Sequence, residues 1–432
     1  RHFSSSPPAE GTDLGPLWEE LEEHLVPYLS GNLHPRFFGW AHGGGTPAGA
    51  VAELIAGFLN ANLAGRNQAP VLLERQVTGW FSELFDFPES ASGTLVGGTS
   101  IGNLVGLAVA RDRTTGLFSS APRGPEPRVY ASESCHLSVT RAAHLTGFPD
   151  RAVVQVETGD GGGLDPGRLR ERIRRDREAG HEPAAVVATL GTSGTGALDP
   201  LPAIAGLCEE HGLWLHVDGA FGALAYLSPD PPPELGALPE ADSLAFDFHK
   251  WLSAPYSAGC VLVRDREAHL DTFRASAPYT RVASGELGGG RPWPTSFGPE
   301  MSRGFRGLKV WLTVRRHGLD RLVEQIDQAR RQAARFADRI RERPELRLCA
   351  PARLNVVCFR YEGRPGLSPG QSDRLQERII ESLQRRGVAA PSAAVVDGET
   401  CVRAAVFNHR TRTEDLEALG QAVVETGREL RD

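Results

Sequence analysis

Lysine is almost absent from this chain of 432 residues. Of its 47 lysines and arginines, only Lys250 and Lys309 are lysines. Arginine keeps its positive charge but does not lose its proton, so it cannot serve as an amine nucleophile. A lysine retained against this bias either indicates amine chemistry, with imine formation the obvious candidate, or is a rare residue that fell there by chance.

Sequence signals of several other protein classes are also missing. Neither lysine follows a glycine, which excludes the P-loop of nucleoside triphosphatases, and the H-E-x-x-H motif of zinc proteases does not occur. No apolar run approaches the roughly 18 residues needed to span a bilayer. The six cysteines form no C-x-x-C pair, which favours reduced thiols in a cytoplasmic protein over a disulfide framework or a zinc site.

The chain has no strong excess of charge of either sign. Its formal net charge is −7, with acidic and basic residues mixed throughout. We therefore expect neither a nucleic-acid partner nor an anionic membrane surface as a partner. The apolar fraction of 40% and the 49 glycines are typical of a soluble globular enzyme. This length suits two or three domains, or one large α/β unit with appendages.

From about residue 90 the pattern alternates between strands and helices. Continuous apolar runs predict strands, and these are 128–131, 152–156, 184–190, 213–217, 243–246 and 259–263. Continuous rather than alternating hydrophobicity is typical of strands buried on both faces, as in a mostly parallel sheet. The last two runs lie too close together for a helical crossover, so we expect that pair to be antiparallel.

The two ends of the chain have a different pattern. A helical pattern over 14–30 predicts an N-terminal helical arm. Near the C-terminus, a long helix and a few further elements predict a small α+β domain. These elements are the helix 319–342, strands 355–360 and 401–407, and helices 372–386 and 413–425. The predicted division is 1–49 for the arm, 50–315 for a large domain and 316–432 for the small domain.

The run 97–103, Gly-Gly-Thr-Ser-Ile-Gly-Asn, leads directly into a predicted helix. Its small residues let the backbone approach an anion closely, its hydroxyls add donors, and the helix N-terminus contributes a positive potential. Thr99 and Ser100 are therefore candidate phosphate ligands. The alternative is an ordinary helix N-cap preceded by glycines.

His136 and Asp218 each follow an apolar run, where a strand of the expected sheet ends. Ligands of open α/β sheets bind at this carboxyl edge. An imidazole at this edge could stack on a flat ring, although a single histidine is more often a structural hydrogen-bonding group. A carboxylate there loses hydration energy unless it meets a cation or caps backbone amides, and no Lys or Arg lies within its motif.

Lys250 also follows an apolar run. A phosphate cradle, a stacking imidazole, a buried carboxylate and a lone lysine would thus meet at one sheet edge. Pyridoxal 5'-phosphate (PLP) requires these four groups, namely a phosphate site, a ring platform, an anion at the pyridine nitrogen and a Schiff-base lysine. Chance accounts for all four together far less well than for any one of them. The sequence therefore predicts PLP as the cofactor.

Six motifs then occur in an order that resembles a known family. They are His-Pro-Arg-Phe-Phe at 34–38, Ala-Arg-Asp-Arg at 110–113, Val-Ala-Thr-Leu-Gly-Thr-Ser at 187–193, His-Val-Asp-Gly-Ala-Phe-Gly at 216–222, His-Lys-Trp at 249–251 and Arg-Gly-Phe-Arg-Gly-Leu-Lys-Val-Trp at 303–311. Together they resemble the group II PLP-dependent amino-acid decarboxylases, over nearly the whole chain from about residue 15. The resemblance implies the α/β architecture called fold type I, with a mostly parallel seven-stranded sheet. It also implies an L-amino acid substrate and an obligate homodimer with active sites at the subunit interface.

The resemblance implies a role for each matching residue. Lys250 would bind PLP covalently, and Asp218 would keep its pyridine nitrogen protonated. His136 would stack on one face of the cofactor ring and, together with Lys250 and Asp218, take part in catalysis. Ala220, a small residue, would pack on the other face.

Further roles follow from the same resemblance. Thr99 and Ser100 would bind the phosphate, with His249 beside them or facing the substrate carboxylate. Asp247 stands where related enzymes often have asparagine, which leaves its part in phosphate binding open.

The remaining implied contacts concern the ring hydroxyl and the substrate. Ser193 or Thr192 would contact the ring hydroxyl of the cofactor. Arg403 would bind a substrate carboxylate, where the planar guanidinium suits bidentate geometry, or else is an ordinary strand arginine. Trp40 and His42 would lie near the substrate side chain.

The expected reaction is decarboxylation of an L-amino acid to the amine and CO2. Members of this group carry a tyrosine on a mobile loop that protonates the carbanion, but 282–302 contains no tyrosine and Tyr279 fits the element before that loop. Related enzymes without this tyrosine divert the carbanion to O2, so decarboxylation-coupled oxidative deamination to an aldehyde is the alternative, followed by other lyase or aminotransferase chemistry. The glycine-rich run 285–290 suits a mobile lid. A non-catalytic scaffold is least favoured, because it would have no reason to retain Lys250 and Asp218 together.

Overall fold

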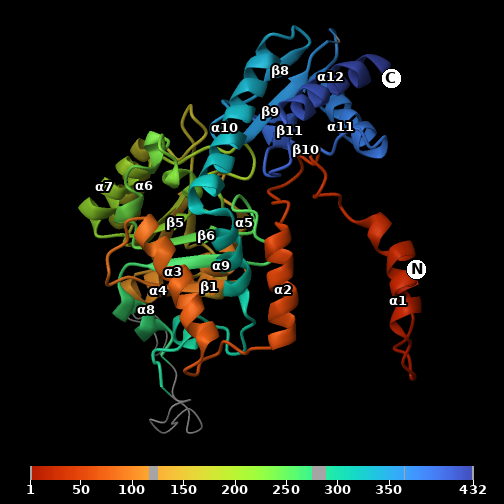
Figure 1. Ribbon diagram of the computed structural model, residues 1–432. Helices are drawn as coiled ribbons and strands as arrows, with labels where there is room; N and C mark the ends of the chain where they lie inside the picture. Colours follow the sequence, from red (N-terminus) through yellow and green to blue (C-terminus); the bar gives the residue numbers. More distant parts are fainter. Residues whose placement is uncertain (1, 116–124, 275–288, 364, 431–432) are drawn as a thin grey trace.

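The computed structural model describes residues 2–115, 125–274, 289–363 and 365–430. Helices pack around a large and a small β-sheet, and the small sheet lies at one end of the molecule (Figure 1). Part of the tyrosine-free segment 282–302 lies outside the described residues. The same holds for Tyr279 and for most of the glycine-rich run 285–290.

The large sheet contains seven strands, in the spatial order β1-β7-β6-β5-β4-β2-β3. They are β1 (Ser92–Val96), β2 (Pro127–Ser132), β3 (Val153–Val156), β4 (Glu182–Thr189), β5 (Trp214–Asp218), β6 (Ser243–Asp247) and β7 (Gly259–Val263). Strands β2 to β6 pair in parallel, whereas β7 runs antiparallel between β1 and β6. This confirms the mostly parallel sheet and the antiparallel last pair.

Helices cover both faces of this sheet, which is why its strands read as continuous apolar runs. Successive residues of a strand enter different cores, so that Val186 packs in one cluster and Val187 in the other. One face carries α4 (Thr99–Thr115), α5 (Leu137–Leu145) and α8 (Arg266–Thr272), and the other carries α3 (Ala69–Leu84), α6 (Pro166–Glu178) and α7 (Leu201–His211). The carboxyl edge of the sheet stays free for the site.

The C-terminal part is a four-stranded antiparallel sheet with three helices. Its strands are β8 (Leu346–Leu348), β9 (Val356–Tyr361), β10 (Ser392–Val396) and β11 (Glu399–Ala405), in the order β10-β11-β9-β8. The helices are α10 (Leu319–Arg341), α11 (Pro369–Arg385) and α12 (Thr413–Glu429). The sequence predicts these three helices and the two strands β9 and β11, but not β8 and β10. The division of the chain at residues 49 and 315 stays a prediction.

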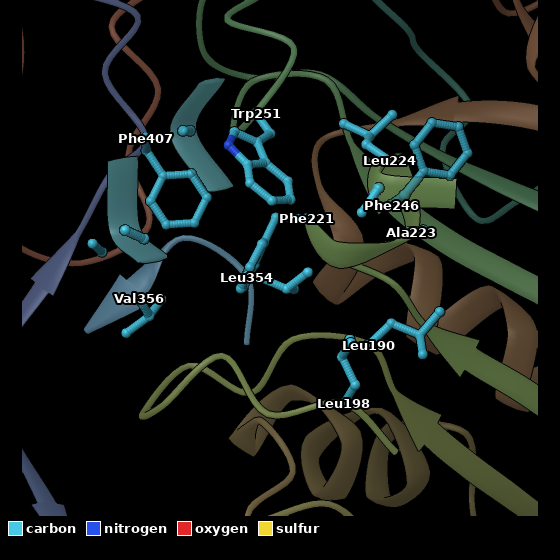
Figure 2. Packing of buried hydrophobic residues seen from close by; sticks show 14 of the residues in the cluster. Leu190, Leu198, Phe221, Ala223, Leu224, Phe246, Trp251, Leu354, Val356 and Phe407 are labelled. Carbon is cyan, nitrogen blue, oxygen red and sulfur yellow. The ribbon is translucent and has the colours of Figure 1, made fainter. Parts of the chain in front are cut away.

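An aromatic cluster joins the two sheets. The ring of Phe221 lies 5.7 Å from that of Trp251 and 4.9 Å from that of Phe407, both edge-on. Figure 2 shows these rings together with Leu354 and Val356 of the C-terminal part. Since Phe221 also lines the cavity described below, the small sheet packs directly behind the wall of the site.

The N-terminal region contains α1 (Leu14–His24) and α2 (Pro47–Leu59). Helix α1 is shorter than the predicted 14–30, has no buried residue and lies apart from the rest of the chain (Figure 1). Helix α2 packs along α9 (Arg306–His317), where Lys309 forms an ion pair with Glu53. One of the two lysines is therefore structural.

Short 3-10 helices complete the described elements. They are η1 (His2–Ser4), η2 (Val26–Tyr28), η3 (Gly222–Leu227), η4 (Pro233–Leu235), η5 (Leu238–Glu240) and η8 (Pro294–Phe297). Within the described ranges, no helix is both long enough and apolar enough to cross a membrane.

Candidate active site

A cavity of about 440 Å³ opens at the carboxyl ends of β4, β5 and β6, beside the first turn of α4. Most of the residues singled out from the sequence line it, namely Thr99, Ser100, His136, Ser193, Asp218, Ala220, Asp247, His249 and Lys250. The other lining residues are Ala41, Gly97, Gly98, Ile101, Ser138, Thr189, Gly191 and Phe221. The strand ends bring these groups together from distant parts of the chain.

Lys250 presents an amine at the wall of this cavity. Its Nζ lies 3.0 Å from Oδ2 of Asp247, the last residue of β6. In the preceding residue, His249, Nδ1 lies 2.8 Å from the carbonyl oxygen of Ala258, and burial lowers the pKa of this histidine. Unlike Lys309, which is buried in its ion pair, Lys250 remains partly exposed to the cavity.

The glycine turn before α4 forms a cradle that contains one buried donor without an acceptor. The backbone N–H of Thr99 donates to Oδ1 of Asp247 over 2.7 Å, but its buried hydroxyl has no hydrogen-bond partner. A Cβ on Gly259 would lie 2.8 Å from the Cα of Gly98, so glycine is required for this close approach. An unsatisfied hydroxyl at a helix N-terminus fits an anion such as a phosphate.

Asp218 is a buried carboxylate at the end of β5. It accepts hydrogen bonds from Nδ2 of Asn103 at 2.8 Å and from the backbone N–H of Ala220 at 3.3 Å. Burial raises the pKa of Asp218, whereas the hydrogen bond from Asn103 and the charge of Lys250 oppose that rise. Among the described residues no Lys, Arg or His forms an ion pair with it. A cation placed in the cavity would supply the missing partner.

His136 caps the N-terminus of α5 and lines the cavity. Its Nδ1 accepts the backbone N–H of Ser138 at 3.2 Å and lies 2.7 Å from the Ser138 hydroxyl. These bonds fix the plane of the imidazole. The ring is thus held in place beside the cavity rather than free to rotate.

Four residues expected near the site do not line the cavity. Thr192 is buried and uses its hydroxyl to accept the backbone N–H of Ala197. Trp40 is 60% exposed, and its ring lies 5.3 Å from that of the half-buried His42. His42 follows Ala41, which lines the cavity, and burial and the neighbouring charges of His249 and Lys250 lower the pKa of His42.

Arg403, the fourth of these residues, is buried on β11 behind the cavity wall. Its guanidinium donates to the carbonyl oxygens of Gly194 at 3.0 Å and Trp40 at 3.1 Å and to the hydroxyl of Ser392 at 3.3 Å. No acidic side chain contacts it within the described parts of the chain. It is therefore a buried cation whose contacts are all neutral.

Asn103 and Ser138 contact the site residues but were not predicted from the sequence. Asn103 lies four residues after Thr99, so helical spacing places both on the same side of α4 and was the available signal. Ser138 lies two residues after His136 and was detectable only once its hydroxyl was placed. Over the described residues, no group of three or more His, Cys, Asp or Glu side chains is arranged to bind a metal ion.

Comparison with known proteins decides the family. The model of the pyridoxal-dependent decarboxylase conserved domain matches residues 2–362. The chain belongs to the pyridoxal-dependent decarboxylase family. It is a PLP-dependent amino-acid decarboxylase of fold type I.

Individual relatives of this decarboxylase include enzymes with two different outcomes. It is 31% identical to the aromatic-L-amino-acid decarboxylase of Bacillus atrophaeus, over 96% of this chain and 85% of that protein. It is 26% identical to the 4-hydroxyphenylacetaldehyde synthase of Rhodiola rosea, over 98% and 87%. The crystal structure of Oryza sativa TDC with PLP and tryptamine superposes with a TM-score of 0.91 at 27% identity, over 99% of this chain and 91% of that one.

The residues present fit the cofactor of this family. The unpartnered hydroxyl of Thr99 suits the phosphate, the buried carboxylate of Asp218 suits a protonated pyridine nitrogen, and the amine of Lys250 suits the aldehyde carbon. All three face one cavity. The cavity therefore contains the hydroxyl, the carboxylate and the amine that binding of PLP requires.

Proposed function

We propose that this enzyme decarboxylates an aromatic L-amino acid to the corresponding amine and CO2. The observation that carries the substrate class is a run of rings that leads to the cavity. The ring of His42 lies 5.4 Å from that of Tyr256, and the ring of Tyr256 lies 4.3 Å from that of His249, while the exposed Trp40 and the buried Phe37 both contact His42. Tilted and edge-on contacts between such rings would hold an aromatic side chain.

Several residues of this chain would bind and orient the cofactor ring. When bound, PLP supplies the sink for the electron pair that remains after CO2 departs. Lys250 would bind it covalently, and Asp218 would hold a proton at its pyridine nitrogen. The fixed imidazole of His136 and the small Ala220 would bracket the ring. Preorganised groups of this kind cost no reorganisation when charge develops.

Different residues of the cavity would bind the phosphate and the ring hydroxyl of the cofactor. The helix N-terminus with Thr99 and Ser100 would hold the phosphate. Ser193 lines the cavity and supports the ring-hydroxyl contact better than Thr192, whose hydroxyl is already engaged. Asp247 already accepts the Thr99 amide and pairs with Lys250, so we infer that it orients the lysine.

We propose that Arg403 binds the substrate carboxylate. Its neighbours Gly194 and Trp40 are adjacent in sequence to Ser193 and Ala41, which line the cavity. Burial without an acidic partner lowers the pKa of Arg403 and makes an incoming carboxylate a favourable partner. Orientation of the carboxylate would then select which bond breaks.

A second outcome is supported by one feature of the sequence. The absence of tyrosine from 282–302 removes the expected proton donor for the carbanion. If no other group delivers that proton, O2 would take up the electron pair and two protons to form hydrogen peroxide, and water would then hydrolyse the resulting imine to the aldehyde and ammonia. Amine formation is the first proposal and aldehyde formation the second.

An amino-acid panel on the PLP-loaded enzyme separates these outcomes. We expect amine and CO2 in equal amounts, with kcat/KM for an aromatic substrate at least about tenfold above that for alanine or glutamate. Amine, aldehyde, CO2, ammonia, peroxide and keto acid are each measured. Aldehyde with ammonia and peroxide would select the second outcome, and keto acid without CO2 would contradict both.

We also propose a homodimer in which a second copy covers α1 and α2. Phe58 and Leu54 on α2 are 89% and 75% exposed, and Leu14 and Trp18 on α1 are exposed as well. Isolated chains rarely leave so much apolar surface open.

We further propose a cytoplasmic location. All six cysteines are free thiols, and free thiols are typical of proteins in reducing compartments such as the cytoplasm.

Sedimentation analysis tests the dimer directly. We expect a mass twice the 46.6 kDa of one chain, and a shift toward the single-chain mass when Phe58 and Leu54 are both replaced by serine. Glu89→Gln, an exposed substitution away from both helices, serves as the matched control. A wild-type protein that sediments as a single chain would rule out the proposal.

A further inference from the structure

Behind Asp218, a chain of buried polar side chains crosses from α4 to β5 and β6. Asn103 contacts Asp218 through Nδ2, and its Oδ1 lies 3.0 Å from Nε2 of His216. Nδ1 of His216 lies 2.8 Å from the hydroxyl of Ser243, which accepts Nε1–H of Trp214 at 2.8 Å. Asn103, His216 and Ser243 have no exposed surface. The bonds among these three side chains are therefore shielded from water.

The donors and acceptors in this chain allow one arrangement of protons. The carboxylate of Asp218 accepts, so Asn103 must turn its NH2 toward it and its carbonyl oxygen toward His216. That oxygen has no hydrogen, so Nε2 of His216 carries one. Burial lowers the pKa of His216 to about 3, which keeps the ring neutral and leaves Nδ1 as an acceptor. The hydroxyl of Ser243 then donates to it.

We propose that Asn103 and His216 are positioning residues, which hold Asp218 in its charged form through hydrogen bonds that all point toward its carboxylate. This inference rests on the proposed role of Asp218 at the pyridine nitrogen. Each donor polarises the next bond in the chain, so the bond that reaches Asp218 is strengthened. The buried carboxylate can then remain ionised and pair with a protonated ring nitrogen.

The same amide also orients the imidazole of the site. Nδ2 of Asn103 lies 3.1 Å from the hydroxyl of Ser138, which accepts this second N–H. Ser138 then gives its own hydroxyl proton to Nδ1 of His136, which leaves the proton of His136 on Nε2. One side chain thereby sets the carboxylate and the ring platform together.

Helix α4 is shaped to admit this chain of bonds. A Cβ on Gly106 would lie 2.5 Å from the ring of His216 and 3.1 Å from the hydroxyl of Ser243. Any larger residue would push the imidazole away from Asn103. Gly106 lies three residues after Asn103, on the same side of the helix.

Binding of PLP to the apoprotein tests the inference without relying on activity. His216→Leu fills the space but offers no donor, and we expect it to weaken PLP binding by about tenfold, because a bond that supports a charged group is lost. His216→Gln places an amide N–H near the position of Nε2 and should restore affinity to within about threefold of wild type. Rescue by the amide separates a proton donor from a space-filling residue.

His269 provides a matched control. It is fully buried, with Nδ1 2.8 Å from the hydroxyl of Ser92 and Nε2 3.0 Å from the carbonyl oxygen of Phe297, but it has no connection to Asp218. His269→Leu should leave PLP affinity within about threefold of wild type. Equal weakening by both leucine variants, or wild-type affinity in His216→Leu, would overturn the inference.

Two further measurements make the outcome decisive. Asp218→Asn should weaken PLP binding. If Asp218→Asn weakens PLP binding and His216→Leu does not, the proposed role of Asp218 stands and the inference about His216 falls. If Asp218→Asn leaves PLP binding unchanged, the proposed role of Asp218 fails. Nitrogen NMR of histidine-labelled holoenzyme reads the tautomer in the wild-type protein, with the His216 signal identified by its loss in His216→Gln. A neutral ring protonated at Nε2 supports the inference, and protonation at Nδ1 or at both nitrogens overturns it.

Discussion

Lys250→Arg is expected to lower kcat by at least about a thousandfold while the fold stays intact. The guanidinium keeps the positive charge beside Asp247, where Nζ now lies 3.0 Å from the carboxylate. It cannot lose a proton and attack the aldehyde carbon of PLP, so covalent attachment is lost. Amine release at saturating substrate gives kcat, and borohydride reduction followed by peptide mass analysis identifies the attached lysine.

The second lysine supplies the control for this experiment. Lys309→Arg should preserve the ion pair with Glu53 and keep kcat within about threefold of wild type, since the pair needs only a charge. With two lysines in the chain, the reduced cofactor can reside on only two side chains. Cofactor mass found on Lys309, or activity retained by Lys250→Arg, would contradict the assignment.

Arg303→Leu is expected to lower the free energy of unfolding by about 3–5 kcal/mol. The guanidinium is buried, pairs with the buried Glu74 and donates to the carbonyl oxygens of Leu95 at 2.6 Å and Leu63 at 3.3 Å. Its removal leaves the Glu74 carboxyl, whose pKa burial already raises, without a cation. Urea unfolding followed by fluorescence and extrapolated to water measures the change.

Two variants show whether the loss comes from the unpaired acid. Adding Glu74→Met to Arg303→Leu removes the stranded carboxyl and should recover at least about 2 kcal/mol. Arg174→Leu removes an exposed arginine between Glu171 and Glu178 and should leave the urea midpoint nearly unchanged. If the double variant were no more stable than the single one, the buried pair would not be the cause.

Local hydrophobicity was enough to predict most of the large sheet. The run 259–263 coincides with β7, and the runs 243–246 and 213–217 match β6 and β5 within one residue. Strand β1 was not predicted, because Ser92, Gly93 and Thr94 interrupt the apolar pattern. It is a strand only through its pairing with β7, which a local pattern cannot show.

The site was predictable to the extent that it follows strand ends. His136, Asp218 and Lys250 each follow a predicted strand, and the parallel order of the sheet brings them to one cavity. Asn103 was not recognised, because its bond to Asp218 depends on how α4 packs on β5. For Arg403, its burial, its neutral contacts and its position behind the wall were visible only in the structure.

The order of strands has a consequence for the newly made chain. β1 is at the edge of the large sheet, and among the described strands it pairs with β7 alone. While the protein is being synthesised, β1 must wait with open N–H and C=O groups until Gly259–Val263 leaves the ribosome. The turn before α4 cannot meet Lys250 earlier either, since that lysine lies between β6 and β7. A nascent chain therefore cannot complete its cofactor site until more than half of its length has emerged, and β1 stays an unpaired edge until then.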